Sequence, residues 1–285
     1  MKSANFCVFV INFMILLSSC TNKQTYDYEY YGLNCPVKSV KVTTYEAESK
    51  FGEILNGDLE PDGNYLAVFN GVGNLESISN YDDDGDLTSV EKYKYNEDNK
   101  VTVVASYNND GDLVHQTMYT YNNDHIESFT SKSYWSDKEE IIEYKHKWNG
   151  EYIIETDVLV DGELYSKTKY KNAYKNNREW EWVKYDKDGK EVSRGYEEYN
   201  VCGRIIKRNE GDFYLEVQWN EKNVPIHLKN AHLWNNTDIS WYSGDDECEY
   251  YVEYEYDKKG NWIKQIVYEG EIKKPLTISE RIITY

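Results

Sequence analysis

The chain has little alanine, little proline and no long apolar run beyond its first seventeen residues. Only six of its 285 residues are alanine and four are proline. Alanine is the strongest helix former, so its scarcity argues against a helical protein. A helix that crosses a membrane needs about 20 apolar residues, and no such run follows residue 17. These absences leave a strand-rich protein as the simplest interpretation.

Motifs for several enzyme classes and metal sites are also missing. There is no HExxH or paired CxxC motif, no GxSxG nucleophile motif and no glycine-rich phosphate loop. The five histidines are scattered, whereas a zinc site needs three or four ligands that converge. We therefore expect no metal, no cofactor and no enzymatic activity. A carbohydrate-active enzyme stays open as an alternative, because glycosidase chemistry needs only two carboxylates that folding brings together.

Basic residues are outnumbered by acidic ones. The chain has 32 Lys and Arg against 51 Asp and Glu, and a formal net charge of −19. Loss of Lys2 with a cleaved leader would leave 31 basic residues and a net charge of −20. Such a charge repels the phosphates of nucleic acids and the headgroups of anionic lipids, and it favours basic partners. We expect no nucleic-acid partner.

The first twenty residues differ from everything that follows. Lys2 is the only charge, residues 6–17 are largely apolar, and residues 17–20 read Leu-Ser-Ser-Cys. This order is typical of a secretion signal, and its last four residues resemble the lipobox of bacterial lipoproteins. The resemblance implies cleavage before Cys20, whose thiol would carry a diacylglycerol with palmitate-like chains, and two or three chains anchor a protein stably. The alternative is an ordinary cleaved signal followed by a chance cysteine.

The lipobox resemblance also predicts where the mature chain resides. Residues 1–19 are the predicted signal peptide, and residues 20–34, polar and rich in tyrosine, are the predicted tether. Thr21 follows the cysteine, in the position where Asp retains lipoproteins of some Gram-negative bacteria at the inner membrane. We therefore expect a lipid-anchored protein of the cell envelope, at the outer membrane, on its periplasmic face or on the cell surface.

A turn motif recurs along the rest of the chain. It consists of an aromatic residue, an Asx residue, two or three polar residues with Gly or Asn, and then an apolar residue. From Phe69 to Tyr121 the leading aromatic residues are 12 or 14 positions apart, which leaves room for one strand between turns. The motif begins at Phe69, Tyr81, Tyr95, Tyr107, Tyr185, Tyr199 and Tyr256, with degenerate copies at Tyr121, Trp148 and Trp219.

Each residue type of the motif has a physical role in a hairpin. Asx side chains bond their own backbone and open a turn, and Gly adopts the left-handed conformation that closes a hairpin through a bulge. The aromatic residue and the apolar residue that flank the turn can meet as a cross-strand pair. Consecutive strands joined by tight turns are antiparallel. Residues 35–285 are therefore predicted to be all-β, an antiparallel hairpin-repeat meander that forms an elongated, twisted or rolled sheet, with an insertion at about 227–249.

The Tyr-Asp…Gly…apolar unit resembles the YD (Rhs-type) repeats of bacterial surface proteins. Residues 185–192 resemble the MORN-variant repeats of antitoxin-like proteins, and residues 256–262 with 280–285 are similar to the C-terminus of small YD-repeat lipoproteins. The resemblance covers about half of the chain. It implies a hairpin-repeat fold, with too few repeats for a closed Rhs shell, and no particular activity.

Aromatic side chains are the best candidates for a ligand site. Trp180 and Trp182 alternate with glutamates, so both indoles are predicted to face one side of a strand. Exposed aromatic rings beside carboxylates can stack on sugar rings, and the alternative is that they pack the sheet face. The insertion contributes three more candidates, Trp234, Trp241 and Tyr242.

Two further patterns have a structural alternative. Residues 80–91 have a spacing that resembles an EF-hand loop, but their flanks alternate like strands, so we favour a solvated turn. Three cysteines remain after Cys20, namely Cys35, Cys202 and Cys248. One disulfide, Cys202–Cys248, is predicted outside the cytoplasm, and three buried thiols are the alternative.

Three functions are compatible with these features. The first is a non-catalytic envelope lipoprotein that presents a β-sheet surface to a glycan or protein ligand. The second is an immunity-like or antitoxin-like protein whose acidic surface neutralises a basic toxin. The third is the carbohydrate-active enzyme.

Overall fold

The structure is a computed structural model, and the description covers residues 27–134, 140–150, 152–172, 179–200, 204–211, 213–234, 238–241, 248–270 and 274–285. These residues form one short helix, α1 (Asp27–Tyr30), and strands β1 to β21. None of the described helices is long and apolar enough to cross a membrane. The first strands are β1 (Ser39–Lys50), β2 (Glu53–Leu59), β3 (Asn64–Phe69), β4 (Leu75–Tyr81), β5 (Leu87–Tyr95), β6 (Val101–Asn108), β7 (Leu113–Asn122), β8 (His125–Ser133), β9 (Glu140–Asn149) and β10 (Tyr152–Val160). The remaining strands are β11 (Glu163–Asn172), β12 (Glu179–Asp186), β13 (Glu191–Tyr199), β14 (Ile205–Glu210), β15 (Phe213–Trp219), β16 (Pro225–Lys229), β17 (Ala231–Trp234), β18 (Asp238–Trp241), β19 (Glu249–Tyr256), β20 (Trp262–Glu269) and β21 (Lys274–Thr284).

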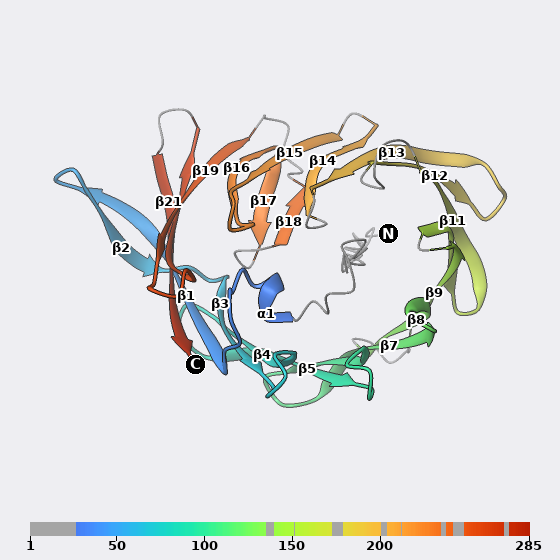
Figure 1. Cartoon of the computed structure of the whole chain (residues 1–285), viewed down its shortest axis with the longest axis horizontal. Helices are drawn as coiled ribbons and strands as arrows, with labels where there is room; N and C mark the ends of the chain where they lie inside the picture. The colour runs from blue at the N-terminus through green and yellow to red at the C-terminus, as the bar shows by residue number, and fades with distance from the viewer. Residues whose placement is uncertain are drawn as a thin grey trace, which may run out of the picture.

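The strands form an antiparallel meander that closes on itself. From β3 to β16 each strand pairs with the next, and β19, β20 and β21 continue the sheet. β1 then pairs with β3 along one edge, where Ser39 is opposite Val68, and with β21 along the other, where Ser39 is opposite Thr284. One sheet holds 19 of the described strands, and all of them except β2 form a closed barrel of 18 strands (Figure 1).

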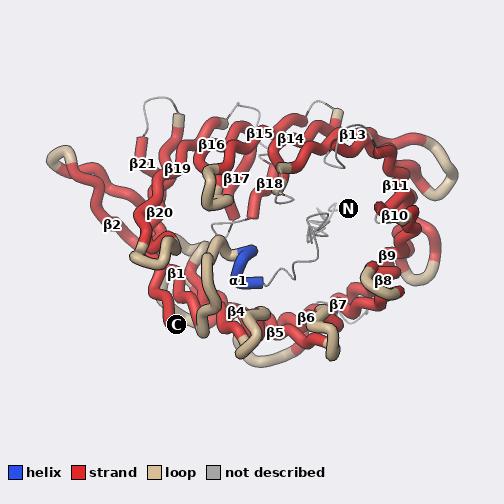
Figure 2. The backbone as a smooth tube through the Cα atoms, viewed as in Figure 1, coloured by secondary structure: helices blue, strands red, loops and turns tan. Residues whose placement is uncertain are grey.

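Strand β2 stands outside this ring. It pairs with the second half of β1, from Tyr45 to Lys50, and the resulting hairpin projects from the barrel (Figure 2). A second, two-stranded sheet is formed by β17 and β18. It lies inside the outline of the ring in Figure 1, and β17 contacts β15.

The predicted all-β antiparallel meander is confirmed, but the predicted elongated, twisted or rolled sheet is wrong, because the sheet closes into a barrel. Turn motifs and period-two alternation are local patterns that are the same in an open sheet and in a closed one. Closure depends instead on pairing between residues 39–46 and residues 277–284. These segments lie at opposite ends of the described meander.

The recurring motif builds the hairpins as the sequence predicts. In the turn between β5 and β6, Asn96 Oδ1 accepts a hydrogen bond from the Lys100 amide at 2.9 Å, and Asn99 is left-handed with φ 59°. A register shift then sets Tyr95 opposite Val101, which is the predicted aromatic–apolar pair. The Asx side chain accepts from the amide four positions on at Asn70, Asp82, Asn108, Asp186, Asn200, Asn220 and Asp257 as well.

Aromatic side chains also tie neighbouring turns together at one end of the barrel. The Tyr121 hydroxyl donates to the Val101 carbonyl at 2.7 Å, so the leading aromatic residue of one turn reaches the apolar residue that ends the previous turn at the same end. Each bond satisfies a hydroxyl or indole N–H that is partly buried. The same link joins Tyr95 to Leu75, Trp148 to Ile126 and Trp219 to Ile205, at 2.7, 2.9 and 2.8 Å.

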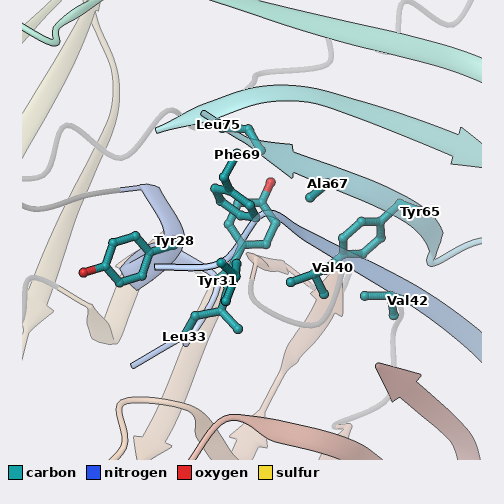
Figure 3. Close-up of a cluster of buried hydrophobic side chains, with 10 residues drawn as sticks. Tyr28, Tyr31, Leu33, Val40, Val42, Tyr65, Ala67, Phe69 and Leu75 are labelled. Carbon is teal, nitrogen blue, oxygen red and sulfur yellow. The ribbon is translucent and has the colours of Figure 1, made fainter. Parts of the chain in front are cut away.

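Residues 27–38 form an N-terminal strap that packs inside the ring. Tyr31 of the strap meets Phe69 edge to face, with ring centroids 5.6 Å apart, and this contact belongs to the largest described hydrophobic cluster (Figure 3). Burial of these apolar side chains holds the strap against the wall. The cluster comprises Tyr28, Tyr31, Leu33 and Val37 of the strap, Val40 and Val42 of β1, Tyr65, Ala67 and Phe69 of β3, and Leu75 of β4.

The strap shows which face of every strand points inward. Val40 packs against the strap and is opposite Ala67, which is opposite Ile78 on the next strand. Because residues directly opposite each other share a face, the register carries this assignment around the ring. It returns from Ser279 of β21 to Thr44 of β1, on the same side as Val40. We call this side the inner face and the other side the outer face.

Candidate functional site

The outer face of the barrel is rich in charge. Lys167 Nζ lies 2.8 Å from Glu155 and 2.9 Å from Asp157 on the neighbouring strand, and Lys92 Nζ lies 5.0 Å from the centre of the Tyr107 ring. All five side chains belong to the outer face by register. A lipid-facing barrel wall carries an apolar band instead. The described outer face is therefore suited to contact with water.

The inner face carries a wall of aromatic rings across β7, β8 and β9. Phe129 stacks on Tyr144 with centroids 4.3 Å apart and an interplanar angle of 15°. Tyr119 lies 5.6 Å from Phe129 on the other side, and His125 stacks on Trp148 at 4.3 Å. Tyr119 is buried, while the other four rings are only half-buried. We call these five residues, together with His146, the aromatic wall.

Hydroxyl and imidazole groups lie among the rings. His115 Nε2 and Ser131 Oγ are 2.6 Å apart, and His146 Nδ1 and Thr156 Oγ1 are 2.9 Å apart. Burial lowers the pKa of His146 to about 4 and also lowers the pKa of His115, so both are neutral at pH 7. His146 Nε2 is buried, and no described residue forms a hydrogen bond with it. The wall therefore offers neutral polar groups beside apolar ring faces.

Two of the predicted ligand residues also face inward, on β12, three strands from β9. Trp180 and Trp182 are opposite Asn172 and Tyr170 of β11, and both face inward by register. Trp180 is buried, with 5% of its surface exposed, and meets Tyr170 edge to face at 6.4 Å. Trp182 is half-buried and lies over Gly195, where a Cβ atom would come within 2.4 Å of the indole. Gly195 thus leaves the space that Trp182 occupies.

One ion pair adds charge beside these tryptophans. Glu197 accepts from Arg208 Nε at 2.6 Å and also from the hydroxyl of Tyr199, whose pKa is raised by burial and by the carboxylate. Glu197 is opposite Trp180 in the register. Its described hydrogen-bond partners use both carboxylate oxygens. The group therefore serves as a fixed anionic acceptor on the inner face.

The other predicted site residues are only partly described. Trp234 is opposite Asp238, and Trp241 is opposite Ala231, so the two lie at opposite ends of the β17–β18 hairpin. Their side chains lie outside the part of the chain that the structure describes. Tyr242, Cys20 and Cys202 lie outside the described residues. The disulfide between Cys202 and Cys248 therefore stays a prediction.

The segment with EF-hand-like spacing folds as a hairpin turn. Asp82 Oδ1 accepts from the Asp86 amide at 2.8 Å, and Gly85 has φ 83°. Glu91, the twelfth position of the spacing, lies along β5 and accepts from the Tyr93 hydroxyl at 2.7 Å. Among the described residues no group of three or more His, Cys, Asp or Glu side chains is placed to hold a metal ion.

A hollow of ≈ 440 Å³ lies at the end of β14 and β15. Its lining asparagines already bond to neighbours: Asn200 Nδ2 donates to Asn223 at 3.2 Å, and Asn220 Nδ2 to the Tyr256 hydroxyl at 3.1 Å. These side chains are used by the turns themselves. The aromatic wall is the stronger candidate site, because apart from the Trp148 indole N–H, which bonds the Ile126 carbonyl, the described polar groups on it bond to one another and not to turns.

Residue-level reasoning from the sequence missed most of this wall. Phe129, Tyr144, His146 and Trp148 alternate with polar residues as in any half-buried strand. The sequence did contain one usable signal. The alternation along each strand, combined with the aromatic–apolar pair that flanks each turn, shows which residues of neighbouring strands share a face. The inner face itself could be recognised only once the strap and the closure were known.

Comparison with family models and with curated proteins finds no match. Among solved structures, the chain is similar to a porin-like protein from Bacteroides uniformis at 12% identity and a TM-score of 0.40, over 87% of this chain and 96% of that one. It is also similar to a porin-like protein from Bacteroides vulgatus at 10% identity and a TM-score of 0.37, over 88% and 99%. TM-scores of this size do not establish a common fold or a common function.

The resemblance to YD and MORN-variant repeats is wrong. No family model matches the chain, and the hairpins do not form an open array of repeats but a single ring of 18 strands closed by β1. The motif that suggested the resemblance is a turn that any antiparallel hairpin can use, because an Asx residue and a left-handed residue suffice to build it.

Proposed function

We propose that this chain is a non-catalytic, lipid-anchored protein of the cell envelope that binds a glycan along its aromatic wall. The observation that carries the proposal is the inner face of β7 to β9, where stacked rings alternate with neutral hydroxyl and imidazole groups. The anchor is the predicted diacylglycerol on Cys20, for which the leader sequence is the support. We expect an outer-membrane location.

The chemistry of the wall favours a sugar over other ligands. A sugar ring has an apolar face of C–H groups that stacks on aromatic rings, and a rim of hydroxyls that hydrogen-bonds to neutral polar groups. Ligand sites generally combine apolar lining with a few placed polar groups. His146 and His115 are neutral at pH 7, so the wall has donors and acceptors for uncharged hydroxyls.

The first prediction tests the wall directly. Replacement of Tyr144 by Ala should weaken binding of a neutral oligosaccharide about tenfold, because loss of a stacked ring costs about 1–1.5 kcal/mol. The measurement is a titration of intrinsic tryptophan fluorescence with chitotetraose, maltotetraose and cellotetraose. Tyr107→Ala is the matched control, because Tyr107 lies on the outer face. Equal losses in the two variants, or no binding of any of the three sugars by the parent protein, would contradict the proposal.

The acidic partner hypothesis has one specific observation in its favour. Exposed carboxylates gather in the turns between β4 and β5 and between β6 and β7, where Asp83, Asp84, Asp86, Asp110 and Asp112 lie. An immunity-like or antitoxin-like role would use this end of the barrel to bind a basic toxin. Such binding should weaken steeply with added salt, whereas stacking on sugars should not.

A catalytic function would need two carboxylates within reach of one substrate. On the inner face Glu91 is bonded to Tyr93, and Glu197 is bonded to Arg208. These glutamates belong to β5 and β13, which are separated by seven strands of the ring. Glu210, opposite Gly195 on the next strand, also faces inward, but both oxygens of Glu197 are already bonded, to Arg208 and to Tyr199. We therefore keep binding as the proposed function and the carbohydrate-active enzyme as the lesser alternative.

A further inference from the structure

The N-terminal strap fixes where the chain can leave the barrel. Asp27 Oδ2 accepts from the Leu75 amide at 2.8 Å and lies 2.6 Å from the Tyr95 hydroxyl, whose single hydrogen is shared with the Leu75 carbonyl at 2.7 Å. Further along, the Asn34 amide donates to Asn261 Oδ1 at 2.7 Å. The partners all belong to turns at one end of the barrel, which we call the strap rim. Part of the predicted tether, residues 27–34, therefore packs on the inner face of the barrel.

The opposite end of the barrel has a different charge. Consecutive turns of a meander lie at alternate ends, so the turns at 82–86 and 108–112 lie at the end away from the strap. We call this end the acidic rim, because the exposed residues Asp83, Asp84, Asp86, Asp110 and Asp112 lie there.

The strap rim carries a group of exposed lysines. Lys222 and Lys259 lie over aromatic rings, with Nζ 3.4 Å from the centre of the Tyr256 ring and 3.1 Å from that of Tyr285. Lys222 Nζ is also 3.4 Å from the Gly260 carbonyl, in the turn that carries Lys258 and Lys259. The three ammonium groups thus belong to two adjacent turns. The same two turns also carry Glu221 and Asp257, so the described group has three ammonium groups and two carboxylates.

The short distance along the chain from Cys20 to the strap limits the reach of an anchor. Cys20 and Asp27 are seven residue steps apart, and an extended chain spans at most about 3.6 Å per step, or roughly 25 Å in all. A strand of nine residues such as β5 is about 30 Å long, and a tilt of about 40° reduces its height to roughly 23 Å. A chain that ran to the acidic rim would have no length left to place acyl chains in a bilayer. At the strap rim it would have length to spare.

We propose that the strap rim docks against an anionic lipid surface, with Lys222, Lys258 and Lys259 over the phosphates and the acidic rim directed away. This orientation rests on the lipid anchor of the proposed function. The chain as a whole is acidic, so the lipid anchor supplies the attachment and the charges of the rims set the orientation. Anionic headgroups repel the acidic rim more strongly than the strap rim, where the three lysines lie. The aromatic wall then runs from the membrane surface outward.

The experiment measures the depth of a fluorophore in vesicles. The lipidated mature chain, with Cys35, Cys202 and Cys248 replaced by Ser, is labelled at Val72→Cys on the strap rim or at Asn109→Cys on the acidic rim. Both positions are exposed and uncharged. The vesicles contain phosphatidylethanolamine and phosphatidylglycerol, with a nitroxide quencher on a fraction of the headgroups. We expect several-fold stronger quenching at position 72, and equal or reversed quenching would overturn the orientation.

Three further variants test the tether, the charge and the lipid anchor separately. Insertion of a Gly/Ser linker of about 20 residues after Lys23, which adds roughly 25 Å of average reach, should bring the quenching ratio toward one. A ratio that stays unchanged would contradict the tether argument. The charge-reversal pair Lys258→Glu and Lys259→Glu should lower the ratio in the linker background. A chain that begins at Thr21, exported behind a leader that is cleaved without a lipobox, tests the anchor separately. We expect it to leave the membrane fraction, and a chain that still fractionated with membranes would refute the lipid anchor, whatever the orientation.

Discussion

At the scale of single residues, His146 couples the inner face to pH. Its pKa lies at about 4 because burial disfavours the imidazolium, while an unfolded chain binds the proton near pH 6.5. As pH falls from about 6.5 to about 4, the unfolded state therefore takes up a proton that the folded state does not. The contribution of His146 to the free energy of unfolding is therefore full above pH 6.5, and about 3 kcal/mol of it is lost as the pH falls to about 4.

The measurement is urea unfolding at pH 7 and at pH 4.5. His146→Gln should lose less stability over this interval than the parent protein, because Gln does not titrate. Carboxylates titrate in the same range in both proteins, so the difference between them isolates the imidazole. An equal loss in the two proteins would show that His146 is not held neutral. The parent protein with Asn109→Gln controls for an amide change at an exposed site.

At the scale of elements, the strap depends on one carboxylate. Asp27 accepts hydrogen bonds from Leu75 and Tyr95, and bonds to a charged acceptor contribute about 1.5–3 kcal/mol each. Asp27→Ala should therefore release the first turn of the strap. Native-state hydrogen exchange should show the Leu33 amide, which donates to the Tyr28 carbonyl at 3.1 Å, exchanging at least about tenfold faster, as expected for a loss of 1.4 kcal/mol or more.

The control for this prediction is Asp83→Ala, a carboxylate removed from an exposed turn on the acidic rim. It should leave exchange at Leu33 unchanged. If Asp27→Ala also left that exchange unchanged, the hydrophobic contacts of Tyr31 and Leu33 alone would hold the strap, and the polar anchor would be dispensable.

The sequence predicted single strands and turns better than it predicted any other level of the structure. The turns at Tyr95 and Tyr107 could be predicted because an Asx residue, a left-handed residue and an aromatic–apolar pair act within about seven positions of each other. The strap could not be predicted, since Tyr28 and Tyr31 pack on residues of β3 and β4 that a polar, tyrosine-rich segment does not reveal. The inner placement of Trp182 likewise depended on Gly195, which is on a different strand.

At the scale of the whole molecule, the barrel reverses the polarity of a membrane barrel. A lipid-facing barrel is apolar outside and polar inside, whereas here Lys167, Glu155 and Asp157 face outward and rings such as Phe129 and Tyr144 face inward. The diameter of a barrel grows with its strand number, and beyond small barrels the wall side chains no longer fill the interior. This agrees with the partial exposure of the inner rings. An anchored barrel of this kind would present its aromatic wall to the interior of the barrel.

Closure is the property on which this arrangement depends, and it can be tested by a cross-link between the two ends of the sheet. Thr43 of β1 is opposite Glu280 of β21, and residues directly opposite in antiparallel strands have Cα atoms about 4.5–5.5 Å apart, within disulfide range. In the chain with Cys35, Cys202 and Cys248 replaced by Ser, Thr43→Cys with Glu280→Cys should therefore form a disulfide on mild oxidation, detected by mass spectrometry of the linked peptides. The control pair, Thr43→Cys with Glu255→Cys, should not, because Glu255 lies on β19, two strands farther round the ring. In an open sheet β1 and β21 would lie at opposite edges, and neither pair would cross-link. Failure of the first pair in folded protein would therefore refute the closed barrel and with it the assignment of an inner face.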